Sequence, residues 1–100
     1  MVQLTADNFK TEAEDAALPV LIEFSGEGGR WEPLEKQLGD RYKFCRVNPE
    51  QERELTDRFH LLGLPASVIL HRGRIIQRIR GVPENPARVL ESGEEPAPGI

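Results

Sequence analysis

RFHLLGLPASVILHRGRIIQRIRG, residues 58–81, is the stretch of the chain that decides the fold. Its Gly-Leu-Pro corner at residues 63–65 predicts the end of a helix, because proline cannot continue one. The apolar run 68–70 and the run 74–80 predict two strands. The dipeptide Arg-Gly at residues 72–73 predicts a tight turn between them, so the C-terminal half contains an antiparallel hairpin.

Upstream of this hairpin, helical and strand patterns alternate. Short, almost uninterrupted apolar runs predict strands that are buried on both faces. We expect a helix over about 7–17, capped by Thr5 and Asp7, and a second helix over 31–38. A third helix is expected to start at Asn48-Pro49, and a short fourth one at Asn85-Pro86, with Val89 and Leu90 facing inward. Strands are expected over 20–24 and 42–47. This order predicts an α/β domain with a mixed sheet covered by helices on both faces, and a further short strand is possible at 2–4.

Length and charge limit the possible classes of protein. One hundred residues suffice for one domain, expected over 1–92, with a disordered tail over 93–100. The net charge of −4 argues against a general nucleic-acid binder, because phosphate neutralisation dominates duplex affinity. No apolar run has the roughly 18 residues of a membrane span, and no secretion signal is visible, so we expect no membrane partner and a cytoplasmic location.

The chain contains one cysteine, Cys45. One cysteine supplies neither a Cys-x-x-Cys redox pair nor a thiolate-rich zinc site, and the two histidines have no metal-ligand spacing. We therefore expect no metal and no cofactor. Cys45 lies in a strand pattern, which favours an inert buried thiol, but a reactive thiol remains the alternative.

Several segments resemble, in order and spacing, the thioredoxin family. They are Leu4–Phe9, Pro19–Phe24, Arg46–Asn48 and the Gly63-Leu64-Pro65 corner, with turn glycines at Gly73 and Gly81. The resemblance covers about residues 2–90. It implies a thioredoxin-like three-layer α/β/α sandwich with a mixed four- or five-stranded sheet. It also implies that Pro65 follows a cis peptide bond and faces the site of thiol chemistry.

The chain departs from the family at that site. Redox-active members have Trp-Cys-Gly-Pro-Cys after the central strand, whereas this chain has Ser-Gly-Glu-Gly-Gly-Arg-Trp-Glu-Pro at residues 25–33. A dithiol reaction needs an attacking thiolate and a second, resolving thiol, and this segment offers neither. The chain is therefore similar to redox-inactive members. Residues 59–70 more weakly resemble the thioredoxin-like accessory proteins of hydrogenase maturation.

The resemblance predicts a non-catalytic accessory module that binds an extended peptide or a partner protein. The expected binding residues are Gly28, Gly29, Arg30, Trp31, Leu64 and Pro65. For Trp31 the open alternative is ordinary helix packing, and for Arg30 it is a solvated side chain. Two other functions stay open: a monothiol thiol-disulfide oxidoreductase that uses Cys45, and a purely structural subunit of a larger assembly.

Two charged features need interpretation. Glu23 is expected at the end of a buried strand, where a carboxylate needs a partner or a raised pKa, and Arg46 on the neighbouring strand is the expected partner. The second feature is a basic hairpin, formed by His71, Arg72, Arg74, Arg78 and Arg80. Its charges either protect a sheet edge from aggregation or bind an acidic partner.

Overall fold

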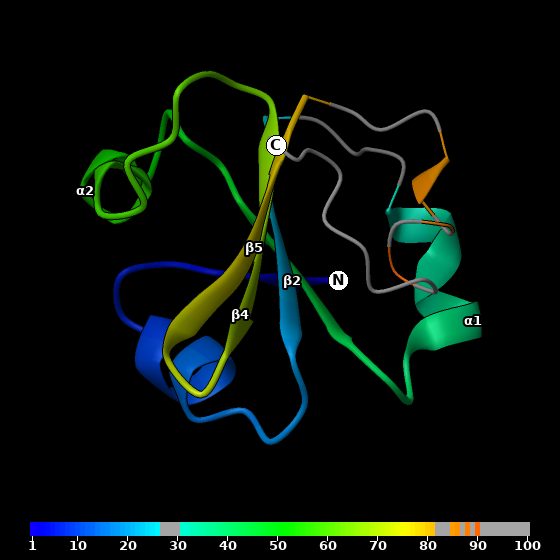
Figure 1. Ribbon diagram of the computed structural model, residues 1–100. Coiled ribbons are helices and arrows are strands. Elements are labelled where there is room, and N and C mark those ends of the chain that lie inside the picture. Colours follow the sequence, from blue (N-terminus) through cyan, green and yellow to red (C-terminus); the bar gives the residue numbers. More distant parts are fainter. Residues whose placement is uncertain (27–30, 82–84, 87, 89, 91–100) are drawn as a thin grey trace.

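The structure, a computed structural model, describes residues 1–26, 31–81, 85, 86, 88 and 90 (Figure 1). Its centre is a mixed five-stranded sheet with the order β1-β3-β2-β4-β5. The strands are β1 Val2–Gln3, β2 Val20–Phe24, β3 Lys43–Val47, β4 Ala66–His71 and β5 Arg74–Arg80. β1 and β2 pair with β3 in parallel, whereas β4 pairs antiparallel with both β2 and β5. The expected mixed sheet, including its optional first strand, is thus present.

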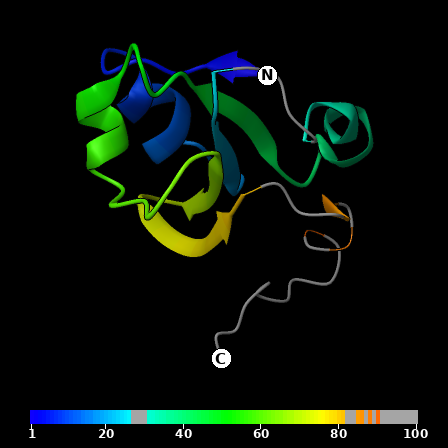
Figure 2. The ribbon, with the colours of Figure 1, turned by 90° about the horizontal axis from the view of Figure 1, so that it is seen from above.

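Helical segments lie on both faces of this sheet (Figures 1 and 2). They are η1 Lys10–Glu14, η2 Glu32–Leu34, α1 Glu35–Leu38 and α2 Arg53–Asp57. η1 and α2 cover one face, and η2 and α1 lie against the other. The fold is therefore a mixed α/β arrangement with short helices.

Each face of the sheet has its own hydrophobic core. Alternate residues of a strand point to opposite faces, so Ile22 and Leu21 belong to different cores. The core on the side of η1 and α2 contains Leu4, Phe9, Ala13, Val20, Ile22, Phe24, Cys45, Val47, Leu55, Phe59, Val68 and Leu70. The core on the side of α1 contains Leu21, Trp31, Leu38, Phe44, Ile69, Ile79 and Leu90. β2 is buried along its whole length, which explains its uninterrupted apolar run.

The first expected helix is shorter than the sequence pattern indicates. Within the expected span 7–17, the structure has only the π-helical turn η1. Thr5 and Asn8 bond to each other across the turn that precedes η1: the Asn8 N–H donates to Thr5 Oγ1 at 3.3 Å, and the Thr5 N–H donates to Asn8 Oδ1 at 2.7 Å. Phe9 takes the N-cap position of η1 and makes no side-chain capping bond, so neither Thr5 nor Asp7 caps this helix as expected.

The expected helix start at Asn48-Pro49 is wrong. Asn48 Oδ1 accepts a hydrogen bond from the Glu50 N–H at 3.0 Å, and the Asn48 carbonyl accepts from the N–H groups of Gln51 and Glu52. These bonds form a turn, because a short polar side chain competes with helical backbone bonds. Glu52 then has non-helical angles, φ −119° and ψ 63°, and α2 begins only at Arg53.

Part of the C-terminal region lies outside the described residues. The Arg88 N–H donates to the Asn85 side chain at 3.3 Å, as expected for a cap, and Leu90 is buried. Val89 and the expected tail 93–100 are not among the described residues. Within the described part of the chain, no helix has the length and apolar character needed to cross a lipid bilayer.

Candidate functional site

The Leu64–Pro65 peptide bond is cis, as the resemblance implies. The corner is attached to the sheet by its carbonyl, because Pro65 O accepts the Gly81 N–H at 2.9 Å. Both side chains face outward, and Leu64 is 53% exposed. Two of the six expected binding residues therefore form an exposed apolar corner at the start of β4.

A surface hollow of about 540 Å³ adjoins this corner. It lies where the carboxyl ends of the parallel strands β2 and β3 meet, a usual place for binding sites in α/β sheets. The hollow is lined by Phe24, Ser25, Gly26, Asn48, Pro49, Glu50, Leu64 and Pro65. Sequence reasoning missed 48–50 because it assigned them to a helix, although the rule that parallel strands end at one edge could have placed them here.

The segment before the proline, residues 61–64, has unused backbone groups. None of the hydrogen bonds between described residues involves the N–H or C=O groups of these four residues. Leu62 is 84% exposed, and a second hollow of about 640 Å³ lies between this segment and the C-terminal end of α2. Exposed donors, acceptors and apolar side chains together suit pairing with an extended peptide. Nothing in the sequence pattern distinguished Leu62 from a core leucine.

Trp31 does not line this surface. Its side chain is 2% exposed, and its indole Nε1–H donates to Ser67 Oγ at 2.8 Å in the core beneath α1. The structure thus favours ordinary helix packing, the alternative left open for this residue. Gly28, Gly29 and Arg30 lie outside the described residues.

Glu23 and Arg46 lie side by side on the α1 face of the sheet, as expected. Glu23 is 3% exposed, and its Oε1 lies 4.0 Å from Arg46 Nε. Neither of these two atoms has a hydrogen-bond partner among the described residues. Burial raises the pKa of the Glu23 carboxyl, an effect that Arg46 opposes and nearby Glu32 increases. The pair is therefore a long ionic contact between a buried carboxyl group and a partly exposed guanidinium group.

Cys45 is a free, fully buried cysteine in the core between β3 and η1. Burial raises the pKa of its thiol to about 11. A nucleophilic thiol needs exposure and a lowered pKa, so this environment suits an inert side chain.

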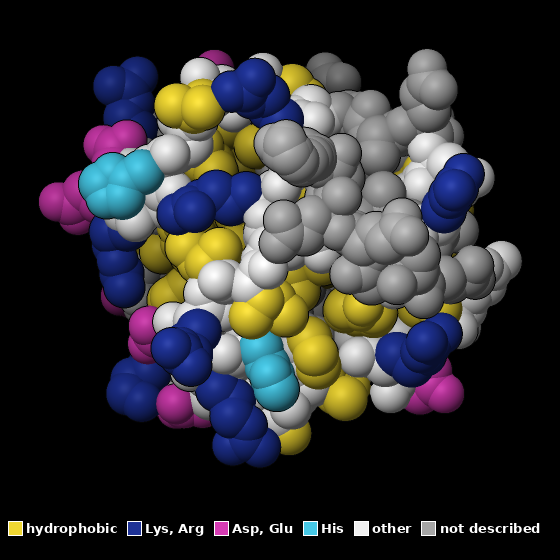
Figure 3. Space-filling view, viewed as in Figure 1, with side chains coloured by type: hydrophobic (Ala, Val, Ile, Leu, Met, Phe, Trp, Pro, Cys, Tyr) yellow, Lys and Arg dark blue, Asp and Glu magenta, His cyan; other side chains and the backbone are white. Residues whose placement is uncertain are grey.

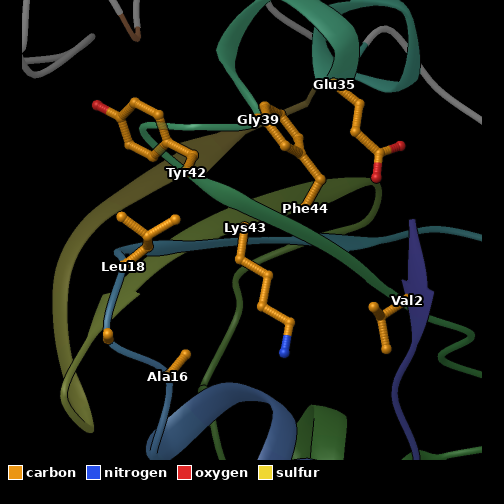
Figure 4. Close-up of a pocket in the computed structure, with 9 residues that line it drawn as sticks. Val2, Ala16, Leu18, Glu35, Gly39, Tyr42, Lys43 and Phe44 are labelled. Carbon is orange, nitrogen blue, oxygen red and sulfur yellow. The ribbon is translucent and has the colours of Figure 1, made fainter.

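A further hollow, of about 390 Å³, lies beside β3 (Figure 4). Lys43 and Phe44 point to opposite sides of the strand there, and the Phe44 ring extends toward α1 and Gly39. The charged groups already have partners: Lys43 Nζ lies 2.7 Å from Glu12 Oε1, and Glu35 Oε1 lies 2.9 Å from the Met1 amino group. The charged side chains that line this hollow are therefore engaged within the protein and are less available to orient a ligand.

No cluster of three or more histidine, cysteine or acidic side chains suited to a metal ion occurs among the described residues. The most suitable candidate site is thus the exposed corner with its two hollows. No protein-family model matches this chain.

Proposed function

We propose that the chain is a thioredoxin-like domain that does not catalyse thiol-disulfide exchange and binds an extended peptide segment of a partner protein. The binding surface comprises the exposed corner, residues 61–65, and the adjoining edge, residues 24–26 and 48–50. Leu64 supplies an apolar contact, and the backbone of residues 61–64 supplies hydrogen-bond donors and acceptors.

The order and direction of the elements support the thioredoxin-like part of the proposal. A parallel β1-β3-β2 unit joins an antiparallel β4-β5 hairpin, with helical segments on both faces. The cis bond before Pro65 lies at the entry to β4, where the resemblance implies one.

One observation carries the binding function: an apolar, outward-facing corner with unused backbone groups borders a hollow at the carboxyl ends of β2 and β3. Binding energy at such surfaces concentrates in a few anchoring side chains. Leu64 is suited to be an anchor because it borders both hollows.

The burial of Cys45 argues against the monothiol alternative. These 100 residues contain no second cysteine, so they cannot supply both thiols of a dithiol mechanism. We expect no turnover in an insulin-reduction assay with thioredoxin reductase, and robust turnover would contradict the non-catalytic assignment.

A capture experiment tests the binding surface. The intact chain, Leu64→Asp and the control Leu18→Asp are each used to capture partners from native lysate. Leu18 is a partly exposed apolar residue just before β2, at the opposite end of that strand from Ser25. We expect the control to retain a partner that Leu64→Asp loses, with affinity reduced about 30-fold for an anchoring residue. Equal capture by Leu64→Asp, with an unchanged melting temperature, would show that the surface is wrong.

A further inference from the structure

Positive and negative charges are segregated along the chain. Between Arg58 and Pro83 there are five arginines, two histidines and no acidic residue. Because the whole chain has a net charge of −4, the remainder carries nine more acidic than basic side chains. The acidic excess thus lies outside the segment that contains residues 61–65 and the β4–β5 hairpin, although Glu50 lines the hollow beside that corner.

The arginines of the basic hairpin have no acidic partners within the described part of the chain. Arg72, Arg74, Arg78 and Arg80 are all exposed, and the ion pairs between described residues involve none of them. By contrast, Lys10 and Lys43 each lie within 3.1 Å of a carboxylate. Unpaired cations on a chain rich in carboxylates are available to a partner.

Two of these arginines lie next to the exposed corner. Arg80 is opposite Ala66, the residue that follows Pro65, and the Gly81 N–H bonds to Pro65 O. Arg78 is opposite Val68, and its Nη2 lies 3.5 Å from the Phe59 carbonyl on the α2 side of the sheet. Arg72 and Arg74 are at the far end of the hairpin, which is therefore not one uniform basic face.

In Figure 3, dark-blue Lys and Arg side chains lie beside yellow hydrophobic ones on the surface between α2 and β5. A segment that contacts Leu64 and continues along the C-terminal end of β5 meets Arg80 and then Arg78. Both guanidinium groups present planar sets of donors, which match carboxylates well.

We propose that the partner segment is acidic: an apolar residue contacts Leu64, and neighbouring Asp or Glu side chains pair with Arg78 and Arg80. This inference rests on the proposed function and adds the chemistry of the ligand. The apolar contact fixes the position of the segment, while the ion pairs select acidic sequences and speed association.

Synthetic peptides and the intact chain provide the test. Three fluorescein-labelled peptides share a central Val-Leu-Val and differ in their flanks, which are Glu, Gln or Lys on both sides. Fluorescence anisotropy measures each dissociation constant at low and at physiological salt. We expect the Glu peptide to bind about tenfold more tightly than the Gln peptide at low salt, and this preference to shrink as salt is added.

Charge reversal then locates the preference. Arg78→Glu/Arg80→Glu should abolish the advantage of the Glu peptide, whereas Lys36→Glu/Arg41→Glu, with the same change in net charge on and after α1, should preserve it. Arg80→Glu alone is a milder variant, because Arg80 makes no side-chain hydrogen bond or ion pair with described residues. Far-UV circular dichroism and melting temperature verify that each variant is folded.

The outcomes separate the two proposals. Equal binding of the Glu and Gln peptides, with loss of both in Leu64→Asp, would overturn the acidic preference and leave the proposed function intact. No binding of any peptide would overturn both proposals.

Two other outcomes would change the kind of partner. Tighter binding of a single-stranded RNA than of the Glu peptide would replace the acidic segment by a nucleic acid. Self-association in sedimentation that Arg78→Glu/Arg80→Glu abolishes would assign the acidic segment to a second copy of this chain.

Discussion

The buried hydrogen bond from Trp31 to Ser67 yields a prediction about stability rather than binding. Ser67→Ala removes the acceptor and leaves the indole N–H without a partner in a site where Trp31 is 2% exposed. Trp31→Phe removes the donor and also part of the packing in the core beneath α1. Both changes should lower the free energy of unfolding.

The expected size follows from the geometry. An unsatisfied buried donor costs about 1–3 kcal/mol, so Ser67→Ala should destabilise the fold by this amount. Trp31→Phe should cost about 1–3 kcal/mol, since it loses a net hydrogen bond and part of a buried ring. In a domain of this size, each kcal/mol corresponds to about 4–8 °C in melting temperature.

Urea unfolding of the single and double variants, followed by circular dichroism, gives the coupling between the two side chains. We expect about 0.5–1.5 kcal/mol of coupling, because the double variant loses a bond that each single variant has already broken. Trp31 is also the sole tryptophan, so its fluorescence reports its own environment. An emission maximum like that of free indole in water would refute the buried position of Trp31, and additive effects in the double variant would refute its hydrogen bond to Ser67.

Two further predictions concern the buried titratable groups. Because the pKa of Glu23 is raised above 4.5, its ionisation opposes folding: the penalty is absent below pH 4.5 and grows as the pH rises through the folded-state pKa. Glu23→Gln should therefore raise the free energy of unfolding at pH 7 and leave it unchanged at pH 4, as measured by urea unfolding. A lower free energy of unfolding at pH 7 would show instead that the contact with Arg46 is net favourable. The second group is the Cys45 thiol, whose pKa of about 11 leaves only about one thiol in a thousand ionised at pH 8. A small aromatic disulfide should therefore label Cys45 slowly until the chain unfolds. Rapid labelling of the folded chain would restore the monothiol alternative.

The strands could be predicted well because their signal is local. β2 has the bounds that its apolar run predicts, and β3 differs by one residue at its start. The turn at Arg72-Gly73 also lies where expected, and both residues have positive φ angles, 53° and 83°. Gly73 takes this conformation without strain, since it lacks a side chain at Cβ.

The helices and the site were harder to predict because they depend on contacts between distant residues. The start of α2 was misplaced since Asn48 forms a turn with Glu50, and a capping residue and a turn residue look alike in sequence. Trp31 could not be assigned to the core until its partner Ser67, 36 residues away, was known. The exposure of Leu62 follows from the course of residues 61–64, which no periodic pattern specifies.

The pairing of β5 with β4 contains a shift whose effect reaches both cores. The register changes between Ile69 and Leu70, so that Ile76 is an extra residue without a partner. Ile75 and Ile79 are an even number of positions apart and would share one side of a regular strand. Because of the extra residue, Ile79 belongs to the core beneath α1 and Ile75 packs against the other. One extra residue thus lets the edge strand β5 contribute side chains to both hydrophobic cores, and its deletion would move part of the strand's side chains to the opposite face of the sheet.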